Sequence, residues 1–457
     1  MDVIKSLRYS PMNMGRWYAV FLCLLCNVID GLDLLLASYA LPHLPQGFAS
    51  AEEKGLLISL GFMGMAFGSV VIGPMADRFG RRRLIVASLF VSTLALAITA
   101  MASGVELVLA ARLLTGIAVG TVTPLSFVLA DEYASESRRS VCVGIVALGF
   151  PMGSTLGGLI GLIIIDSFGG AWQPLFGFGA LLSFLVFLIA LISLPESLTF
   201  LVSRQPKGAE RRIARIVKRM RLTEAHQDGA EKPGASQPAA ENTAGILSPK
   251  YRTRTWLIWA GYAASSTAFY FVTTWTPQLV SSATGSTTTG TLVGTILSVG
   301  GFVATVLFTL IMLKAGPTRV CWTAGIIAIV AQFAFALTLA NGGAVFAAAV
   351  LGMSLQTVQA AYVASCTRLY PTLLRAKAEG LMMGFSRIGT ILVPLLVGVV
   401  LSVISPQTMY LVASVFVVVA TAAAFALWTT TKTDLTGAAG SQPGSRTRNA
   451  PTSLAGR

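Results

Sequence analysis

Two aspartates, Asp30 and Asp33, lie in a stretch, residues 17–41, whose other residues are almost all apolar. A charged side chain at the centre of a bilayer costs roughly 2.5–3.5 kcal/mol even on the most lenient insertion scale. At a spacing of three residues, the two carboxylates lie close to one face of a helix. We interpret them as part of a path for an ion or substrate. The alternative is a pair of buried acids that only hydrogen-bond neighbouring helices.

The composition indicates a protein that crosses the membrane many times. Of 457 residues, 54% are hydrophobic and only 11% are charged, whereas about 25% of residues are charged in soluble proteins. The formal net charge of +14 would suit nucleic acid, but its placement argues against such a partner. We expect the lipid bilayer to surround the chain.

Apolar runs long enough to cross a bilayer need about twenty residues. The sequence predicts twelve: 17–41, 55–76, 84–103, 105–130, 141–165, 172–194, 255–280, 288–313, 320–340, 343–367, 378–403 and 407–429. They form a first group at 17–194 and a second at 255–429. A polar segment, 195–254, separates the groups and includes a predicted basic amphipathic helix at 207–221. Residues 1–16 precede the first span, and a disordered tail is expected at 430–457.

The positions of lysine and arginine predict the orientation of the chain. Nearly all of the 33 basic residues fall in the termini and in alternate loops; Arg112 and Arg387 lie inside spans, and Lys54 lies in a loop on the other side. Since cytoplasmic loops are rich in Lys and Arg, both termini are predicted to be cytoplasmic. A faint repeat, Tyr133-x4-Arg138 and Tyr370-x4-Arg375, suggests two parallel six-helix halves.

The loop after the second span, residues 73–82, resembles the signature G-x-x-x-D-R-x-G-R-R of the major facilitator superfamily. The resemblance implies an all-α membrane protein of twelve transmembrane helices in two six-helix halves. The motif would form a charged clasp that holds one conformation of the carrier shut, with a tight turn at one glycine and close helix packing at the other. The blander interpretation is that its arginines only set topology. The residues assigned to conformational gating are Gly73, Asp77, Arg78, Gly80, Arg81, Arg82, Glu132, Arg138 and Arg375.

Three further segments resemble the aromatic acid:proton symporters, the bacterial carriers for benzoate and hydroxybenzoates. Asp30-Gly31-Leu32-Asp33 is similar to that family's D-G-x-D, and segments at 132–153 and 370–389 are similar to its other motifs. The resemblance implies a carrier in the bacterial inner membrane that imports a small organic acid together with protons. The proton gradient would supply the energy, and no cofactor or metal is implied. The second-half counterpart of the signature loop, at 314–319, departs from the pattern because it lacks the acid.

Depth along the helices suggests roles for the charged residues. Asp33 lies eight residues from the outer end of its span and Arg112 seven from the start of its own, or roughly 12 and 10 Å deep. We predict that these two pair, and that Asp30 and Asp33 are the proton carriers. Arg387, near the midplane, is predicted to hold the substrate carboxylate because a guanidinium matches it with two parallel hydrogen bonds. Aromatic side chains that could flank the substrate ring, or only pack, are Tyr39, Tyr270, Trp275 and Tyr362.

Other functions stay open at this point. The chain could be a proton-coupled exporter of drugs or metabolites, although Ser154 replaces the proline of the exporters' G-P-x-x-G-G element. It could import a sugar or an aliphatic acid instead, or act as a membrane receptor for aromatic acids. No nucleophile–base pair or metal-ligand cluster indicates an enzyme. We expect a monomer.

Overall fold

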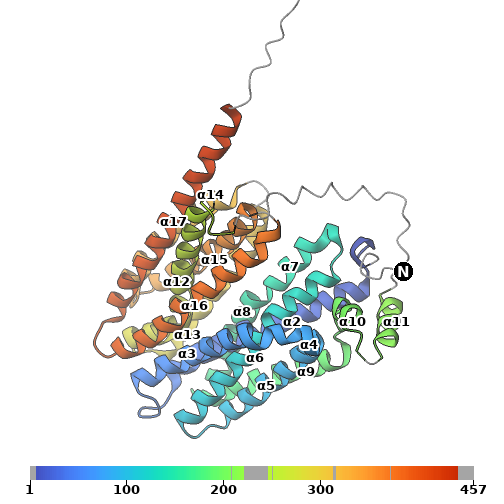
Figure 1. The fold of residues 1–457 in the computed structure, drawn as a ribbon. Coiled ribbons are helices and arrows are strands. Elements are labelled where there is room, and N and C mark those ends of the chain that lie inside the picture. Colours follow the sequence, from blue (N-terminus) through green and yellow to red (C-terminus); the bar gives the residue numbers. More distant parts are fainter. Residues whose placement is uncertain are drawn as a thin grey trace, which may run out of the picture.

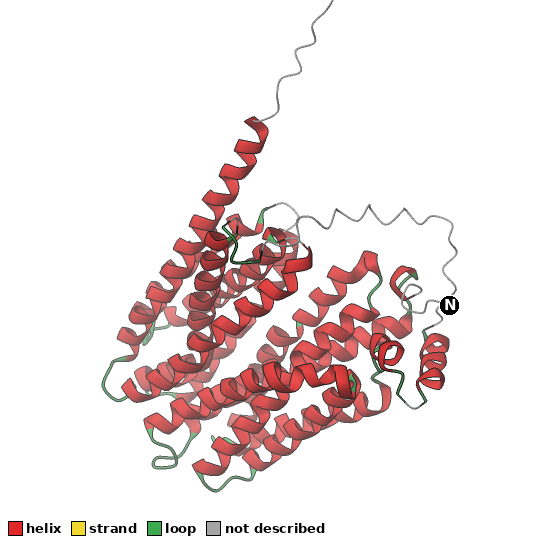
Figure 2. Ribbon diagram, viewed as in Figure 1, coloured by secondary structure: helices red, strands yellow, loops and turns green. Residues whose placement is uncertain are grey.

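The computed structural model describes residues 7–206, 208–220, 245–249, 251–311, 315–370 and 372–440, which fold into helices joined by short loops (Figure 2). In the N-terminal half, the long helices are α2 (Met14–Ala40), α3 (Ala51–Phe67), α5 (Arg81–Ala100), α6 (Val105–Tyr133), α8 (Gly149–Ser167) and α9 (Gln173–Ser193). A π-helical turn, Gly68–Ile72, extends α3, and α7 (Arg139–Ala147) leads into α8. The short helices are α4 (Ala76–Phe79), α10 (Leu198–Arg204) and α11 (Ala209–Arg219).

The C-terminal half contains six long helices: α12 (Arg252–Thr284), α13 (Thr287–Ile311), α14 (Pro317–Thr338), α15 (Gly343–Leu369), α16 (Thr372–Val400) and α17 (Pro406–Gly440). The two halves meet along three helix pairs, α3 with α16, α8 with α13, and α2 with α12. Figure 1 shows them side by side, splayed apart toward the end where α7, α10 and α11 lie. The predicted start of the tail at residue 430 falls within α17, and 441–457 lie outside the described residues.

Eleven helical segments in the described part of the chain are long and apolar enough to cross a membrane. The seventh predicted span, α12, is the exception, although it is 33 residues long. It carries buried hydroxyl side chains, including Ser265, Thr273 and Thr276, and packs against α2, α13, α15, α16 and α17. This helix can be polar because protein rather than lipid surrounds most of it.

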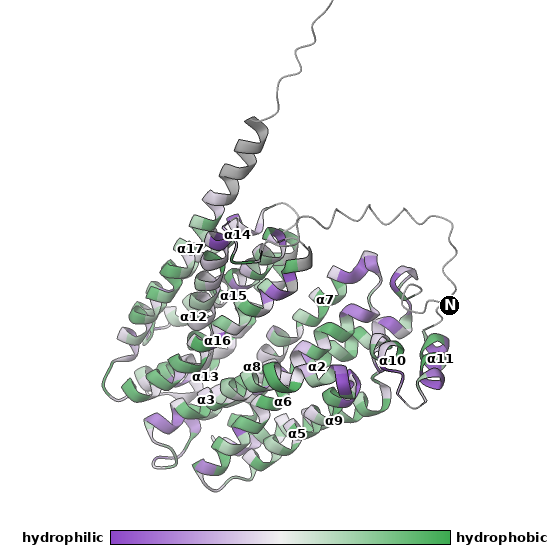
Figure 3. Ribbon diagram, in the orientation of Figure 1, coloured by the Kyte–Doolittle hydropathy of each residue, from purple (hydrophilic) through white to green (hydrophobic). Residues whose placement is uncertain are grey.

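The two ends of the bundle differ in charge. One end, which we call the basic end, carries the loop between α3 and α5, the loop between α6 and α7, and helices α10 and α11 (Figure 3). Its exposed arginines include Arg78, Arg138, Arg204 and Arg211. The other end, which we call the opposite end, carries the loops that follow α2, α12 and α16.

Small residues bring the helices around the two aspartates close together. A methyl group added at Gly31 of α2 would lie 1.9 Å from the Phe150 carbonyl oxygen of α8, and one at Gly153 would lie 2.0 Å from that of Val28. Between α3 and α6, a methyl group at Gly116 would lie 2.2 Å from the Gly61 carbonyl oxygen. Only glycine permits backbone contacts this close, and they set the positions of Asp30, Asp33 and Arg112.

At the basic end, the buried guanidinium of Arg16 fastens the N-terminal segment to the bundle. It donates hydrogen bonds to the carbonyl oxygens of Tyr133 at 2.7 Å, Ser10 at 2.7 Å, Leu7 at 2.8 Å and Pro11 at 3.2 Å. These acceptors are all neutral; three belong to the segment before α2 and one to the end of α6. The cation therefore ties residues 7–11 to the last residue of α6.

The central segment contributes one amphipathic helix to the basic end. In α11, Ile213, Ile216 and Val217 pack against the apolar core of the N-terminal half, while Arg211 and Arg215 are exposed. Asn13 hydrogen-bonds the Met220 carbonyl oxygen just after this helix. Within the polar segment predicted at 195–254, residues 207, 221–244 and 250 lie outside the described residues.

Candidate functional site

The centre of the site is an ion pair between α2 and α6. Arg112 Nη1 lies 2.8 Å from Asp33 Oδ1, and Arg112 Nη2 lies 3.1 Å from Asp33 Oδ2. Both side chains are buried, so the pair exchanges hydration for two parallel charge-assisted hydrogen bonds. The structure thus brings together the aspartate and arginine that the depth estimate placed at one level.

Asp30, one turn deeper on α2, has a different environment. Its Oδ2 accepts a hydrogen bond from Thr123 Oγ1 at 2.8 Å, and no described arginine forms an ion pair with it. Arg387 of α16 is near enough to interact electrostatically with Asp30 and with Tyr270. Asp30 and Arg387 belong to different halves, so this interaction depends on how the halves are positioned.

A small cavity connects the two aspartates. It is lined by Asp30, Asp33 and Arg112 together with apolar side chains of α2 and α3, and has room for about one water molecule. The Arg112 Nε is buried and without a partner in the described part of the chain. The arrangement places two buried carboxylates and one guanidinium around a cavity that holds about one water-sized group.

Aromatic side chains from both halves gather beside this cavity. The rings of Phe62 on α3 and Tyr270 on α12 are 4.9 Å apart, edge to face, and Tyr270 is 5.2 Å from Phe269. Phe150 on α8 is 6.5 Å from Phe269. These four rings, which we call the aromatic cluster, bridge the halves next to Arg387. They offer apolar ring faces and edges beside a cation, which is the chemistry that an aromatic carboxylate requires.

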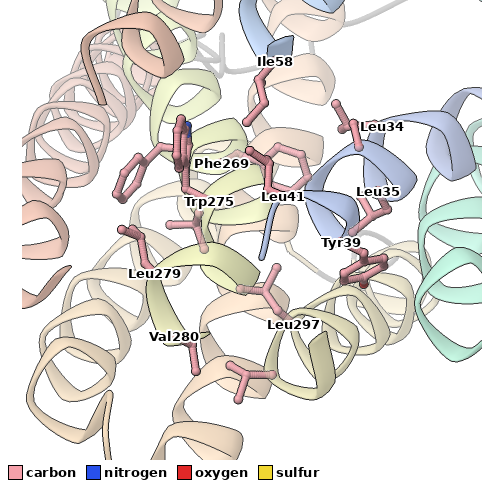
Figure 4. Close-up of a cluster of buried hydrophobic side chains, with 14 of the residues drawn as sticks. Leu34, Leu35, Tyr39, Leu41, Ile58, Phe269, Trp275, Leu279, Val280 and Leu297 are labelled. Atoms are coloured by element: carbon pink, nitrogen blue, oxygen red, sulfur yellow. The ribbon is translucent and has the colours of Figure 1, made fainter. Parts of the chain in front are cut away.

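The halves are held together toward the opposite end. Ser38 Oγ donates to the Thr274 carbonyl oxygen at 2.6 Å, and Ser59 Oγ donates to that of Ile391 at 2.9 Å. Gly55 and Gly398 face each other so closely that an added methyl group at Gly55 would lie 2.9 Å from the Gly398 Cα. Figure 4 shows the buried apolar cluster that joins α2, α12 and α13 here. These contacts close the opposite end.

Three of the predicted aromatic ligands lie outside the aromatic cluster. Tyr39 is buried at the closure, with its hydroxyl 3.5 Å from Thr295 Oγ1. Trp275 is fully buried in the apolar core near the closure (Figure 4). Tyr362 donates a hydrogen bond to the Ala420 carbonyl oxygen in a separate buried cluster of the C-terminal half. Of the four, the structure brings only Tyr270 beside Arg387.

The signature loop is held by its own half. Glu196 Oε1 accepts a hydrogen bond from the Arg82 backbone N–H at 2.9 Å at the start of α5, where a helix favours an anion. Arg81 pairs with Glu132, and Gly80 adopts φ +99°, as the predicted tight turn requires. Asp77 is exposed and 4.0 Å from Arg81. The half-to-half clasp expected from the motif is not formed in this conformation, because every described partner of these side chains lies in the N-terminal half.

The remaining gating candidates have local environments. Arg78 stacks over Phe79, Arg138 is exposed, and Arg375 Nε donates to the Tyr370 carbonyl oxygen at 3.1 Å. A methyl group at Gly73 would make only an ordinary 3.6 Å contact with the Gly68 carbonyl oxygen. The close helix contact expected at Gly73 is therefore absent here.

Sequence reasoning missed Thr123, Phe62, Phe150 and Thr273. Thr123 could have been found, since it follows Arg112 by eleven residues, about three helical turns, and so shares its face of α6. The aromatic residues carry no such signal, because their function depends on contacts between the two halves.

Comparison with known proteins shows the family of this chain. The family model of the Major Facilitator Superfamily matches residues 23–372. The chain belongs to this superfamily. The predicted fold is thereby confirmed, and the D-xylose-proton symporter has the same fold, with a TM-score of 0.68 at 16% identity over 90% of this chain and 96% of the other. The xylose transporter XylE from Escherichia coli, in a partially occluded inward open conformation, also matches with a TM-score of 0.68, at 17% identity over 91% of this chain and 99% of the other.

Curated relatives are similar over most of their length. A 4-hydroxybenzoate transporter of Pseudomonas aeruginosa is 30% identical over 397 residues, covering 86% of this chain and 88% of the relative. A gallate transporter of Pseudomonas putida is 30% identical over 407 residues, covering 88% and 89%. A benzoate transport protein of Acinetobacter baylyi is 24% identical over 420 residues, covering 89% and 88%.

Proposed function

We propose that this carrier imports an aromatic carboxylic acid together with protons by alternating access. The observation that carries the proposal is the position of Arg387. Its guanidinium, on α16 of the C-terminal half, interacts electrostatically with the Asp30 carboxylate of the other half and with Tyr270 of the aromatic cluster. The relatives named for 4-hydroxybenzoate, gallate and benzoate support the substrate class.

Orientation follows from charge. The basic end faces the cytoplasm, because Lys and Arg are retained on that side of the inner membrane. Both ends of the chain are then cytoplasmic. The contacts at Ser38, Ser59 and Gly55 close the outer side, so the described conformation opens inward.

Coupling arises from competition for one cation. When Asp30 is ionised it attracts Arg387, and a substrate carboxylate must compete for the same guanidinium. A proton on Asp30 removes that competitor, so substrate binds Arg387 best when Asp30 is protonated. Release of the substrate to the cytoplasm returns Arg387 to Asp30 and favours release of the proton. Proton and substrate thereby favour the same states of the carrier, which is the thermodynamic condition for symport.

The other charges have supporting roles. The Asp33–Arg112 pair fixes α2 against α6 and shares the cavity with Asp30. The proton gradient is the energy source, with no cofactor and no covalent chemistry.

The test is uptake of labelled 4-hydroxybenzoate into cells, with and without a protonophore. We expect accumulation that the protonophore abolishes. Asp30→Asn is expected to end accumulation while still exchanging labelled for unlabelled substrate, because the neutral amide mimics the protonated state. Arg387→Ala is expected to raise the KM by about tenfold to a hundredfold, the effect of losing hydrogen bonds to a charged group.

The matched controls are Asp166→Asn and Arg319→Ala, which alter exposed residues away from the site. Accumulation that withstands the protonophore would exclude symport. Active extrusion of the substrate would favour the exporter, and uptake of sugars or aliphatic acids alone would favour a different importer.

A further inference from the structure

A second small cavity lies between the halves, and its lining includes Thr273, which lies one helical turn nearer the opposite end than Tyr270. Its apolar walls include Phe150 and Phe269 of the aromatic cluster. Its polar side chains are Ser154 of α8, Thr273 of α12, Ser298 of α13 and Gln356 of α15. The space accommodates about one water-sized group.

Thr273 is the unusual member of this lining. Its side chain is buried, at 4% exposure, and its hydroxyl has no hydrogen-bond partner in the described part of the chain. Neighbouring threonines of the same helix satisfy their hydroxyls locally: Thr274 donates to the Tyr270 carbonyl oxygen at 2.6 Å, and Thr267 donates to that of Ala263 at 2.8 Å. Most buried hydroxyl groups in native proteins have a hydrogen-bond partner, so the Thr273 hydroxyl is available to a group that enters the cavity.

The other polar groups leave capacity for a ligand. Ser154 and Ser298 donate to carbonyl oxygens of their own helices, at 3.1 Å each, and keep lone pairs free. Gln356 is half-buried, and no described residue hydrogen-bonds its side-chain amide. Together these groups can both donate to and accept from one small hydroxyl group.

The position of the cavity fits a group carried on the substrate ring. Thr273 follows Tyr270 by three residues, so it lies one turn farther along α12, about 4.5 Å by the helical rise. Phe269 lines the cavity and also contacts the Tyr270 ring. A carboxylate held at Arg387 would extend its ring past Tyr270 and Phe269 and bring the far side of the ring to Thr273.

We propose that this cavity binds a hydroxyl group on the aromatic ring, which makes the carrier selective for hydroxylated over unsubstituted aromatic acids. The inference rests on the proposed function, because it takes Arg387 as the carboxylate site. Thr273 and Gln356 are the residues that set the preference. A site built to hydrogen-bond a substrate hydroxyl discriminates against an analogue without it, since the buried polar groups then stay unpaired.

The experiment compares unlabelled 4-hydroxybenzoate and benzoate as competitors of labelled 4-hydroxybenzoate uptake. In the unmodified carrier, 4-hydroxybenzoate should compete at lower concentration. Thr273→Val removes the hydroxyl at nearly constant shape, and we expect the ratio of the two inhibition constants to fall roughly five- to tenfold, the effect of one neutral hydrogen bond. Thr273→Ser should retain most of the preference. Thr274→Val is the matched control, because that hydroxyl is already satisfied, and should leave the ratio unchanged.

Gln356→Met provides a second test on another helix, should Thr273→Val not reach the membrane. It is expected to lower the same ratio. An unchanged ratio in both Thr273→Val and Gln356→Met would overturn the inference while leaving the proposed function intact. Equal weakening of both competitors would also overturn it, because that result indicates a structural role. Absence of any aromatic acid uptake by the unmodified carrier would overturn the proposed function, and the inference with it.

Discussion

The two halves share a membrane and a fold, but their interiors are built differently. The N-terminal half buries Asp30, Asp33 and Arg112 and pairs two of them directly. The C-terminal half lines the same interface with Arg387, aromatic rings and the hydroxyls of α12. Under the proposed function, the N-terminal half would carry the protons and the C-terminal half would recognise the substrate.

Among the variants that test this difference between the halves, removal of Arg112 should have the largest effect. Arg112→Met leaves Asp33 buried without its partner, which costs about 3–5 kcal/mol in measured cases. We expect a large drop in the thermal unfolding midpoint of the purified carrier and loss of transport. The double variant Asp33→Leu/Arg112→Met should regain much of the stability without regaining accumulation. A single variant as stable as the unmodified protein would show that the pair is dispensable for folding.

A larger side chain in the contact between the halves at the opposite end should have an intermediate effect on transport. Gly55→Leu places a side chain where an added methyl group would already lie 2.7 Å from the Pro394 carbonyl oxygen. We expect α3 and α16 to separate, which shifts the carrier toward the state open at the opposite end. To detect this shift, Ser59→Cys is introduced as a probe, since Ser59 is buried beside the closure. The probe should react faster with a membrane-impermeant thiol reagent when Gly55→Leu is also present than when it is absent.

Gly104→Leu is the control for this variant, since nothing lies within 4 Å of an added methyl group there and the backbone φ is −139°. Faster labelling in the control as well would point to general loosening. Unchanged labelling in Gly55→Leu would exclude this contact as the closure.

The smallest expected effect concerns the signature loop. Glu196→Gln removes the charge of the carboxylate that accepts hydrogen bonds from the backbone N–H groups of Arg82 and Ser197. We expect a loss of about 1 kcal/mol of stability, typical of a charge at a helix N-terminus, with transport largely retained. Unfolding of the purified variant in detergent measures this. A loss of transport without a loss of stability would instead assign Glu196 to gating.

The sequence predicts the fold well because the bilayer imposes the strongest constraint. Every backbone polar group must be satisfied within the lipid, so long apolar runs become helices. Even α12, which does not meet the hydropathy criterion that the other spans meet, is predicted at 255–280 as an apolar run of about twenty residues. The helix α17 continues past residue 429 because Thr429 and Thr430 are compatible with helix, and composition alone gives no stop signal there.

The site is predicted only in part, and the reason is geometric. Asp33 and Arg112 lie in one half, so depth along two helices suffices to pair them. The meeting of Arg387 with Asp30 depends on how the two halves pack, and its meeting with Tyr270 depends on how α12 and α16 pack within one half. Periodicity encodes neither. Tyr362 illustrates this limit. The sequence predicts that it could flank the substrate ring, but in the structure its hydroxyl donates a hydrogen bond to the Ala420 carbonyl oxygen.

The four carbonyl oxygens that accept hydrogen bonds from Arg16, which we call the carbonyl cage, have a consequence for folding during synthesis. Residues 7–11, which Arg16 secures, are synthesised before Tyr133, which follows Arg16 by 117 residues. At ordinary rates of translation this gap lasts on the order of ten seconds. The cationic side chain must therefore wait near the membrane surface until the end of α6 emerges. Completion of the cage marks the moment when the first helices of the bundle are locked in register.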